Sequence, residues 1–520
     1  MNTPRRHPLP PIAASLLAVF CSHAAAQSED ADTADLASPA STVEAGVGAV
    51  SKDNQRFGQY SGLKGNGGYG LLDLYLVKRD DASGTWLKLT GRNLGLDSRE
   101  LRFEHERQGN WGYFIDYSQT PRYDPYTVST RLTGVGSSSQ AILGSPTAQE
   151  YHLKTERKAL TFGIEKSFSP GLGLQLRYRD EDKDGARLYG QGTFTEWRFL
   201  TDPINQNTKQ LDATLNYTTP RLQFSGGYYG TWFTNRNLAL NVTGSIAGLS
   251  PVALPPGSDS HQLNLAGGYK FSDTIRGTFK IARARSTQTD VFPTTPVAAS
   301  GASNNLQGRI DSTQLQAGLT ARATQKLTLR ADYRYDDRND KTPVFRYWPS
   351  QNTATSTNDG TNEPRSIRTT RGKLEAGYRL PMGFLLTGGV DYEEKKRNSP
   401  PVRSVDFREK TDETTLRAEL RRSVSETVTG AVSLLHASRG GSAWLPMVTN
   451  NGTTASAGSI APLHLLDRDR DTLRMTVNWM PTDPLSLNLR ADNSRDRYSG
   501  RGLNAFDIGQ IGRASCRERV

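Results

Sequence analysis

The chain has 520 residues, with 64 lysines and arginines against 53 aspartates and glutamates, and a formal net charge of +11. Hydrophobic residues make up 35% of it, and the mean hydropathy is −0.61. These values exclude a bundle of transmembrane helices, because each such helix needs about 20 consecutive apolar residues. They do not exclude a transmembrane β-barrel, in which only every second residue of a strand faces lipid.

The N-terminus has the features of a secretory signal peptide over residues 1–26. Arg5 and Arg6 form a basic start, residues 12–20 form a short apolar core, and Ala24 to Ala26 form a cleavage site. We therefore expect an exported protein of a bacterial periplasm or outer membrane. Residues 27–42 are acidic and poor in apolar side chains, and we expect a disordered periplasmic lead-in there.

From residue 43 the chain alternates apolar and polar residues with a period of two, which is typical of β-strands. In residues 326–335 the odd positions are leucine, alanine or tyrosine, and the even positions are charged residues or threonine. A strand separates these two sets onto opposite faces, whereas a helix would mix them. About 19 such segments follow one another, most of them long enough for the 9–11 residues of a tilted barrel strand.

The alternation predicts which side chains face lipid and which face the lumen of a barrel. The residues that we expect to face lipid are Leu174, Leu176, Leu327, Leu329, Tyr333, Leu473, Val477 and Trp479. The residues that we expect to face the lumen are Arg177, Arg179, Arg276, Lys280, Arg330, Asp332, Arg334, Arg417, Glu419, Arg474 and Arg490. Polar residues are expected in any wide lumen, so the mixed charge only suggests a protein guest. Arg283 and Arg285 fall among the apolar positions, and we expect them to mark the place where their strand leaves the membrane.

The connections between these segments alternate between short turns and long polar loops. Short turns are expected at 168–171, 218–221, 272–274, 323–325, 381–383 and 481–484. Long loops are expected near 119–150, 181–207, 236–258, 286–308, 338–366, 395–411 and 438–468. Short turns on one side and long loops on the other are the pattern of an outer-membrane barrel. We predict an all-β fold, a large antiparallel up-and-down transmembrane β-barrel over residues 43–510.

The last ten residues, 511–520, read IGRASCRERV. Back-translated, they match a common sequencing adapter, and we expect them to be an artefact that follows a truncated gene. A barrel with about 19 strands would be incomplete, because bacterial single-chain barrels have even strand numbers. The two cysteines, Cys21 and Cys516, then fall in the signal peptide and in this tail, so that no disulfide or thiol chemistry is expected.

Sequence motifs of catalysis and of cofactor binding are missing from the chain. It has no CxxCH haem attachment, no phosphate-binding P-loop and no zinc-binding HExxH. Asp180, Asp182, Asp184 and Gly185 match half of a calcium-binding loop, but Gln191 stands where a glutamate ligand is needed. We interpret this stretch as a solvated acidic loop. We expect no enzymatic activity, no metal site and no cofactor bound by this chain.

Two stretches near the N-terminus resemble the opening of the MtrB/PioB family of decahaem-associated outer-membrane proteins. They are FGQYSGLKGNGGYGLLDLYL at 57–76 and GRNLGLDSRELRFEHERQGNWGYFIDYSQTPRY at 91–123. The most specific part is the motif Asn93, Leu94, Gly95, Leu96, Asp97 and Ser98. Some relatives carry a CxxC near the mature N-terminus, which this chain lacks.

The resemblance implies a non-enzymatic sheath in the bacterial outer membrane. Such a barrel houses a periplasmic decahaem or other multihaem c-type cytochrome and forms an electron conduit for metal reduction or iron oxidation. The haem is then carried by the partner, and an extracellular multihaem cytochrome is implied as a further partner. Lipid is expected around the barrel and no nucleic acid partner. Two alternatives remain open: a general outer-membrane porin, and a secreted soluble β protein such as a propeller.

Overall fold

The computed structural model describes most of the chain from residue 40 onward. The described ranges are 40–142, 147–192, 197–244, 251–293, 297–298, 304–348, 360–400, 403, 405–448, 461–482, 485–499 and 510–519. The predicted signal peptide and almost all of the acidic lead-in lie outside them. The chain divides into two compact units. Unit 1 comprises Met1–Phe168, Leu174–Asp212 and Trp232–Pro256. Unit 2 comprises Ser169–Gly173, Ala213–Thr231 and Gly257–Val520.

Unit 1 contains a meander in which each strand pairs antiparallel with the next. Its strands are β1 (Thr42–Val50), β2 (Gly67–Asp80), β3 (Thr85–Arg92), β4 (Arg99–Arg107), β5 (Trp111–Thr130) and β8 (Gln149–Ser169). The three strands that follow along the chain are β9 (Leu172–Gly192), β10 (Trp197–Thr218) and β11 (Leu222–Asn235). The turns within this meander, at 81–84 and 108–110, are short.

Unit 1 also contains a small second sheet made from its loops. Its strands are β6 (Leu132–Thr133), β7 (Ser139–Ile142), β12 (Ala239–Thr243) and β13 (Val252–Ala253). β12 runs parallel to β7, although about 100 residues separate them. Leu132, Leu240 and Val242 of these strands form a buried apolar cluster with Leu200 of β10, so that the small sheet is packed against a long strand of the same unit.

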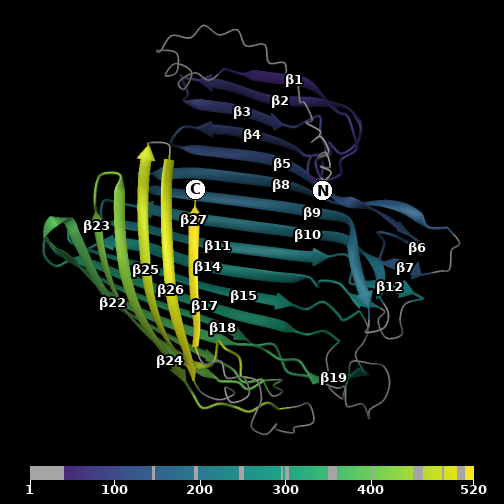
Figure 1. Ribbon diagram of the computed structural model, residues 1–520. Coiled ribbons are helices and arrows are strands. Elements are labelled where there is room, and N and C mark those ends of the chain that lie inside the picture. The colour runs from purple at the N-terminus through teal and green to yellow at the C-terminus, as the bar shows by residue number, and fades with distance from the viewer. Residues whose placement is uncertain are drawn as a thin grey trace, which may run out of the picture. The chain divides into compact units, whose positions relative to one another are not determined.

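Unit 2 is a longer antiparallel meander, in which successive long strands lie side by side (Figure 1). Its long strands are β14 (Ser258–Lys270), β15 (Ile275–Gln288), β17 (Gly308–Arg322), β18 (Leu327–Asp340), β21 (Ile367–Arg379), β22 (Phe384–Arg397), β23 (Lys410–Ser423), β24 (Val428–Gly441), β25 (Asp467–Thr482), β26 (Leu485–Ser499) and β27 (Gln510–Arg519). Short strands in its loops are β16 (Val297–Ala298), β19 (Arg346–Trp348) and β20 (Gly360–Thr361).

The connections of unit 2 alternate as the sequence predicts. Turns of a few residues join β14 to β15, β17 to β18, β21 to β22 and β23 to β24, and we call this the short-turn end. Connections of 12 to 26 residues follow β15, β18, β22 and β24 at the opposite, long-loop end. The 3-10 turn η1 (Pro381–Gly383) is the one helical element of the described residues. Within the same residues no helix is long and apolar enough to cross a membrane.

The prediction of an all-β, antiparallel, up-and-down architecture is confirmed. In the described part of the chain twenty strands have eight residues or more, and nineteen of them precede Gln510. Residues 510–519 form β27, whose backbone pairs with β26. Their interpretation as adapter sequence stays a prediction.

Two of the expected long loops are wrong. Strands β9 and β10 continue through most of 181–207, and β5 continues to Thr130 through the first part of 119–150. The half calcium loop therefore lies on β9 and is no loop. Asn207 donates from Nδ2 to Oδ1 of Asp180 at 2.6 Å and of Asp182 at 3.2 Å. These cross-strand hydrogen bonds stabilise the two aspartates in a strand, whereas the polar composition of this stretch indicates a loop.

Candidate functional site: a charged sheet face, a motif cluster and a loop network

The pairing register of unit 2 sorts its side chains into two faces. Residues directly opposite each other in antiparallel strands point to the same side. One row runs through Arg330, Glu375, Gly389 and Arg417 on four adjacent strands. The next row contains only Leu374 and its neighbours in register, Ala331, Val390 and Leu416. We call the first side the charged face and the second side the apolar face.

The apolar face is exposed, which is the reverse of a soluble protein. Leu263, Leu374, Leu416 and Leu434 are 57–65% exposed. On β18 this face is continuously apolar from Leu327 to Tyr335, a length of about 26 Å at about 3.3 Å per residue. The nine residues from Leu327 to Tyr335 match the 9–11 residues that a tilted strand needs to cross a membrane.

On the charged face, ion pairs form between residues two positions apart in the same strand. Arg330 Nε lies 2.8 Å from Asp332 Oδ2, and Arg334 Nε lies 2.6 Å from Asp336 Oδ2. Lys373 and Glu375 make a pair of this kind on β21, and so do Arg490 and Asp492 on β26. Positions i and i+2 point to the same side of a strand, so the sequence alternation places these partners within reach of each other.

Other ion pairs cross between strands. Arg474 Nε lies 2.6 Å from Asp492 Oδ1 on the neighbouring strand. Arg417 Nη2 lies 2.5 Å from Glu375 Oε2, although β22 runs between them. Gly389 occupies the intervening position in register, and a Cβ there would lie 3.4 Å from Arg417 Nη2. Because Gly389 has no side chain, Arg417 can reach Glu375 across β22. Together, these ion pairs largely neutralise the charges of the face.

The structure sorts the sequence-predicted residues onto the two faces as the alternation requires. On the charged face of unit 2 lie Arg276, Lys280, Arg330, Asp332, Arg334, Arg417, Glu419, Arg474 and Arg490. On its apolar face lie Leu327, Leu329, Tyr333, Leu473, Val477 and Trp479. In β9, Leu174 and Leu176 alternate with Arg177 and Arg179, and Arg179 Nη2 pairs with Glu181 at 2.7 Å.

The motif Asn93 to Ser98 forms a tight turn between β3 and β4 in unit 1. Asn93 adopts a left-handed φ of 53°, which asparagine tolerates better than most residues, and its N–H donates to Asp73 Oδ1 at 2.5 Å. Gly95 packs against the backbone of β2, since a Cβ there would lie 2.1 Å from the carbonyl oxygen of Gly70. Leu96 is buried. The turn is therefore fixed against the neighbouring strand by the hydrogen bond of Asn93 and the close packing of Gly95.

Asp97 joins this turn to two other segments of unit 1. The hydroxyl of Tyr123 donates to Asp97 Oδ2 at 2.6 Å, and Tyr123 N–H donates to the carbonyl of Gln59 at 2.9 Å. Lys64 Nζ lies 3.5 Å from the centre of the Tyr123 ring. We call Lys64, Asp97 and Tyr123 the Asp97 cluster. Burial lowers the pKa of Lys64, and burial together with the hydrogen bond to Asp97 raises the pKa of Tyr123.

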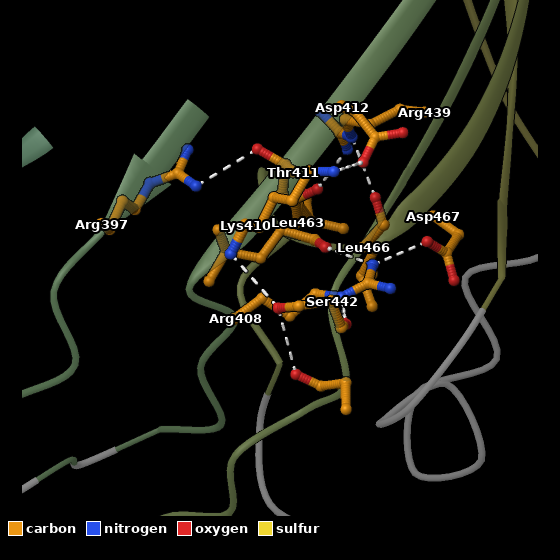
Figure 2. A network of polar contacts seen from close by, with 12 residues as sticks. Arg397, Arg408, Lys410, Thr411, Asp412, Arg439, Ser442, Leu463, Leu466 and Asp467 are labelled. Atoms are coloured by element: carbon orange, nitrogen blue, oxygen red, sulfur yellow. Dashed lines mark hydrogen bonds and ion pairs between the residues drawn. The ribbon is translucent and has the colours of Figure 1, made fainter. Parts of the chain in front are cut away.

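A polar network joins the two long loops that follow β22 and β24 (Figure 2). Arg408 is buried, and it donates to the carbonyls of Ser442 at 2.7 Å and Leu465 at 3.1 Å, and to Asp467 Oδ1 at 2.6 Å. Arg439 donates to the carbonyls of Leu466 at 2.9 Å and Leu463 at 2.8 Å. The planar guanidinium can serve several carbonyls at once, so Arg408 joins the two loops and Arg439 holds the second loop against β24.

His464 lies at the surface of this network, between cationic side chains. Partial burial lowers the pKa of its imidazole from 6.5, and the positive charges of Arg397, Arg439 and Lys395 lower it further. A protonated imidazole is therefore disfavoured when the loop is folded.

No group of three or more histidine, cysteine, aspartate or glutamate side chains among the described residues could hold a metal ion. The role of Arg408 is not predictable from the sequence. An arginine in a polar loop carries no signal that it will be buried, and only the packing of two distant loops shows it.

Comparison with known proteins identifies the family to which this chain belongs. A model described as "Putative outer membrane beta-barrel porin, MtrB/PioB" matches residues 49–507. The chain is 25% identical to "Outer membrane protein MtrB" of Shewanella baltica over 481 residues, which cover 88% of this chain and 67% of that protein.

Among solved structures, the siderophore receptor PirA of Acinetobacter baumannii matches with a TM-score of 0.42 at 10% identity, over 92% of this chain and 70% of its own. The ferric yersiniabactin receptor FyuA of Yersinia pestis matches with a TM-score of 0.38 at 11% identity, over 86% and 70%. The family model covers far more than half of the chain and includes the Asn93 to Ser98 turn. The chain belongs to the MtrB/PioB family of outer-membrane β-barrel proteins.

Proposed function

We propose that this protein is an outer-membrane sheath that houses a periplasmic multihaem c-type cytochrome, so that the two together conduct electrons across the membrane. In this proposal the apolar face of the strands contacts lipid and the charged face lines the lumen. The barrel excludes lipid and positions its guest, and the guest carries all the haem. The role is structural, and no residue of the barrel acts as a catalyst.

The observation that carries the proposal is the self-paired charged face. A pore that selects ions uses rings of side chains of one sign. Here acids and bases alternate along each strand and neutralise one another, as at Arg330 with Asp332 and Arg334 with Asp336. Paired charges still offer hydrogen bonds to a polar protein surface and fix its register, because complementary polar groups specify orientation.

The number of strands points in the same direction. The described part of the chain before Gln510 contains nineteen strands of eight residues or more. Barrels of about 16–18 strands leave an aqueous channel, and barrels of about 22 strands enclose a plug. Nineteen strands lie between these two sizes, so the lumen of such a barrel would be at least as wide as an aqueous channel.

The second candidate function is a general diffusion porin, which the word "porin" in the family description favours. The two are separated by purifying the protein from its native outer membrane in mild detergent. A sheath co-purifies with a protein that stains for covalent haem, and it conducts ions poorly in planar bilayers because its lumen is filled. A porin carries no haem and conducts. A haem-free, conducting preparation would therefore overturn the proposal.

Exchange of charges within the face gives a sharper test. The double variant Arg334→Asp and Asp336→Arg keeps the ion pair and the net charge but reverses its order, and it places no like charges opposite each other in register. We expect it to fold normally, judged by heat-dependent gel mobility, and to lose most of the bound haem. The control exchanges Glu363 and Arg365, an exposed pair two residues apart in a long loop, and should keep the haem. Equal haem in both variants would show that this wall does not contact the guest.

A further inference from the structure

Three cations surround one buried carboxylate on the apolar-face side of β15, β17 and β18. Asp311 Oδ1 lies 2.9 Å from Arg285 Nε, and Asp311 Oδ2 lies 3.0 Å from Arg309 Nη2 and 3.1 Å from Lys341 Nζ. The side chain of Asp311 is only 9% exposed, whereas those of the three cations are 40–52% exposed. We call these four residues the Asp311 cluster.

The cluster lies just beyond the apolar band, at the long-loop end. Arg285 and Asp311 are directly opposite each other, four residues along their strands from the apolar pair Ile281 and Leu315. This distance corresponds to about 13 Å at about 3.3 Å per residue. Long loops of outer-membrane barrels are extracellular, so this position corresponds to the headgroups of the outer leaflet. Arg283 and Arg285 thus mark the end of the band, as the sequence predicts.

The opposite end of the same face has different chemistry. At the short-turn end of unit 2 the apolar face carries the exposed aromatic side chains Tyr269, Tyr378 and Trp479. The exposed ring of Phe271, in the turn after β14, lies 5.0 Å from that of Tyr269. Aromatic girdles are ordinary at both ends of a barrel's apolar band. Hydrophobic matching does not explain why three cations gather about one carboxylate at the long-loop end.

The charge balance of the cluster leaves it cationic. One carboxylate neutralises one of three positive charges, so that the cluster has a formal charge of +2. The carboxylate also holds the cations about a single point, with their exposed surfaces toward the lipid side. Two guanidinium groups and an ammonium group in this arrangement suit a phosphate group, which accepts several charge-assisted hydrogen bonds. Arg283, exposed and two residues from Arg285 on the same face, adds a further charge nearby.

We propose that the Asp311 cluster binds the phosphate groups of an anionic glycolipid of the outer leaflet. The site rests on the assignment of the apolar face to lipid and is independent of any guest in the lumen. Basic pockets at the edge of the hydrocarbon region are known to bind anionic headgroups. The bound glycolipid would fix the barrel at this depth in the membrane.

The test measures the glycolipid retained by the full-length protein. The triple variant Arg285→Gln, Arg309→Gln and Lys341→Gln is purified from outer membranes beside the wild type, and bound lipid A is measured as phosphate and hydroxy fatty acid per protein. We expect a roughly tenfold loss in the variant, because three phosphate contacts are removed. The control is Arg422→Gln on the same face near the short-turn end, where Arg422 stacks on Phe384 at 4.8 Å; it should retain lipid A.

Two further variants test the proposal even if the triple variant folds poorly. Arg283→Glu leaves every ion pair of Asp311 in place and should still reduce lipid A binding. Asp311→Asn leaves three cations without their carboxylate and should retain or increase it, whereas a purely structural cluster would lose both stability and lipid. Unchanged lipid A in the triple variant and in Arg283→Glu would overturn the proposal.

The source of the phosphate is tested by competition. Delipidated wild type in detergent is titrated with lipid A, with dephosphorylated lipid A and with inorganic phosphate. The proposal predicts binding of lipid A alone. Binding of dephosphorylated lipid A would show that the acyl chains suffice, and binding of inorganic phosphate with equal affinity would show a site for free anions. Either result would overturn the assignment to a glycolipid, and neither depends on whether haem co-purifies.

Discussion

The hydroxyl of Tyr123 donates to the carboxylate of Asp97 at 2.6 Å and so joins β5 to the turn that precedes β4. Tyr123 is 7% exposed, and a hydrogen bond to a charged group is worth about 1.5–3 kcal/mol. We expect Tyr123→Phe to lower the stability of the folded barrel by about 2 kcal/mol. Urea unfolding in vesicles measures this. Tyr126→Phe, which removes an exposed hydroxyl bonded to Arg56, is the control and should change stability by less than about 1 kcal/mol.

Gly95 and Gly70 form a matched pair for testing the motif turn. Ala at position 95 would place its Cβ 2.1 Å from the Gly70 carbonyl oxygen, whereas a Cβ at position 70 meets nothing within 4 Å. We expect Gly95→Ala to separate the turn from β2 and to cost about 1–3 kcal/mol or more. Gly70→Ala should be nearly neutral. Equal folding yields for both variants in vesicles would contradict the close packing of this turn.

Leu434 and Leu435 are neighbours in β24 that point to opposite faces. Leu434 pairs in register with the apolar Ala418 and Leu473, and Leu435 pairs with Arg417 and Thr472. An arginine on the lipid side of a barrel costs about 2–4 kcal/mol near the middle of the membrane. We therefore expect Leu434→Arg to impair membrane insertion and Leu435→Arg to be tolerated. The reverse order would exchange the faces that we assign to lipid and lumen.

We expect Arg408 to stabilise the loop network but not the strands of the barrel. Arg408→Lys keeps the charge but cannot serve two carbonyls and a carboxylate in one plane, so we expect residues 405–409, 442–448 and 461–466 to become sensitive to protease. Heat-dependent gel mobility should stay as in the wild type. Arg365→Lys, at an exposed position in another long loop, is the control. Intact loops in Arg408→Lys would mean that the charge alone holds the network.

His464 should make the same loops sensitive to acid. Its pKa is lowered from 6.5 in the folded loop, so the unfolded loop binds a proton more readily. The stability is therefore present above pH 6.5 and is lost as the pH falls below that value. Hydrogen exchange of residues 461–466, corrected for the intrinsic pH dependence, should increase below that pH. His464→Gln should remove the increase, and an unchanged pH profile in this variant would exclude His464 as the cause.

The sequence predicted the two faces well, because the period of a strand fixes the side of every residue once its parity is known. It did not predict which charges pair. The contact between Arg417 and Glu375 needs the register of three strands and a glycine in the middle one. The sequence also did not predict the polar ends of strands that extend beyond the apolar band, as at Asp180 and Asp182. Their composition indicates a loop, and their cross-strand bond to Asn207 is visible only in the fold.

The alternation of acids and bases along β18 has an electrical consequence. Each arginine and its aspartate form a closely spaced dipole, whose potential falls off with distance faster than that of a single charge. The net potential that these two ion pairs impose on an occupant is therefore small, although they contain four charged side chains. A redox centre facing such a wall would keep a reduction potential set by its own protein, and its potential would respond little to the salt concentration outside.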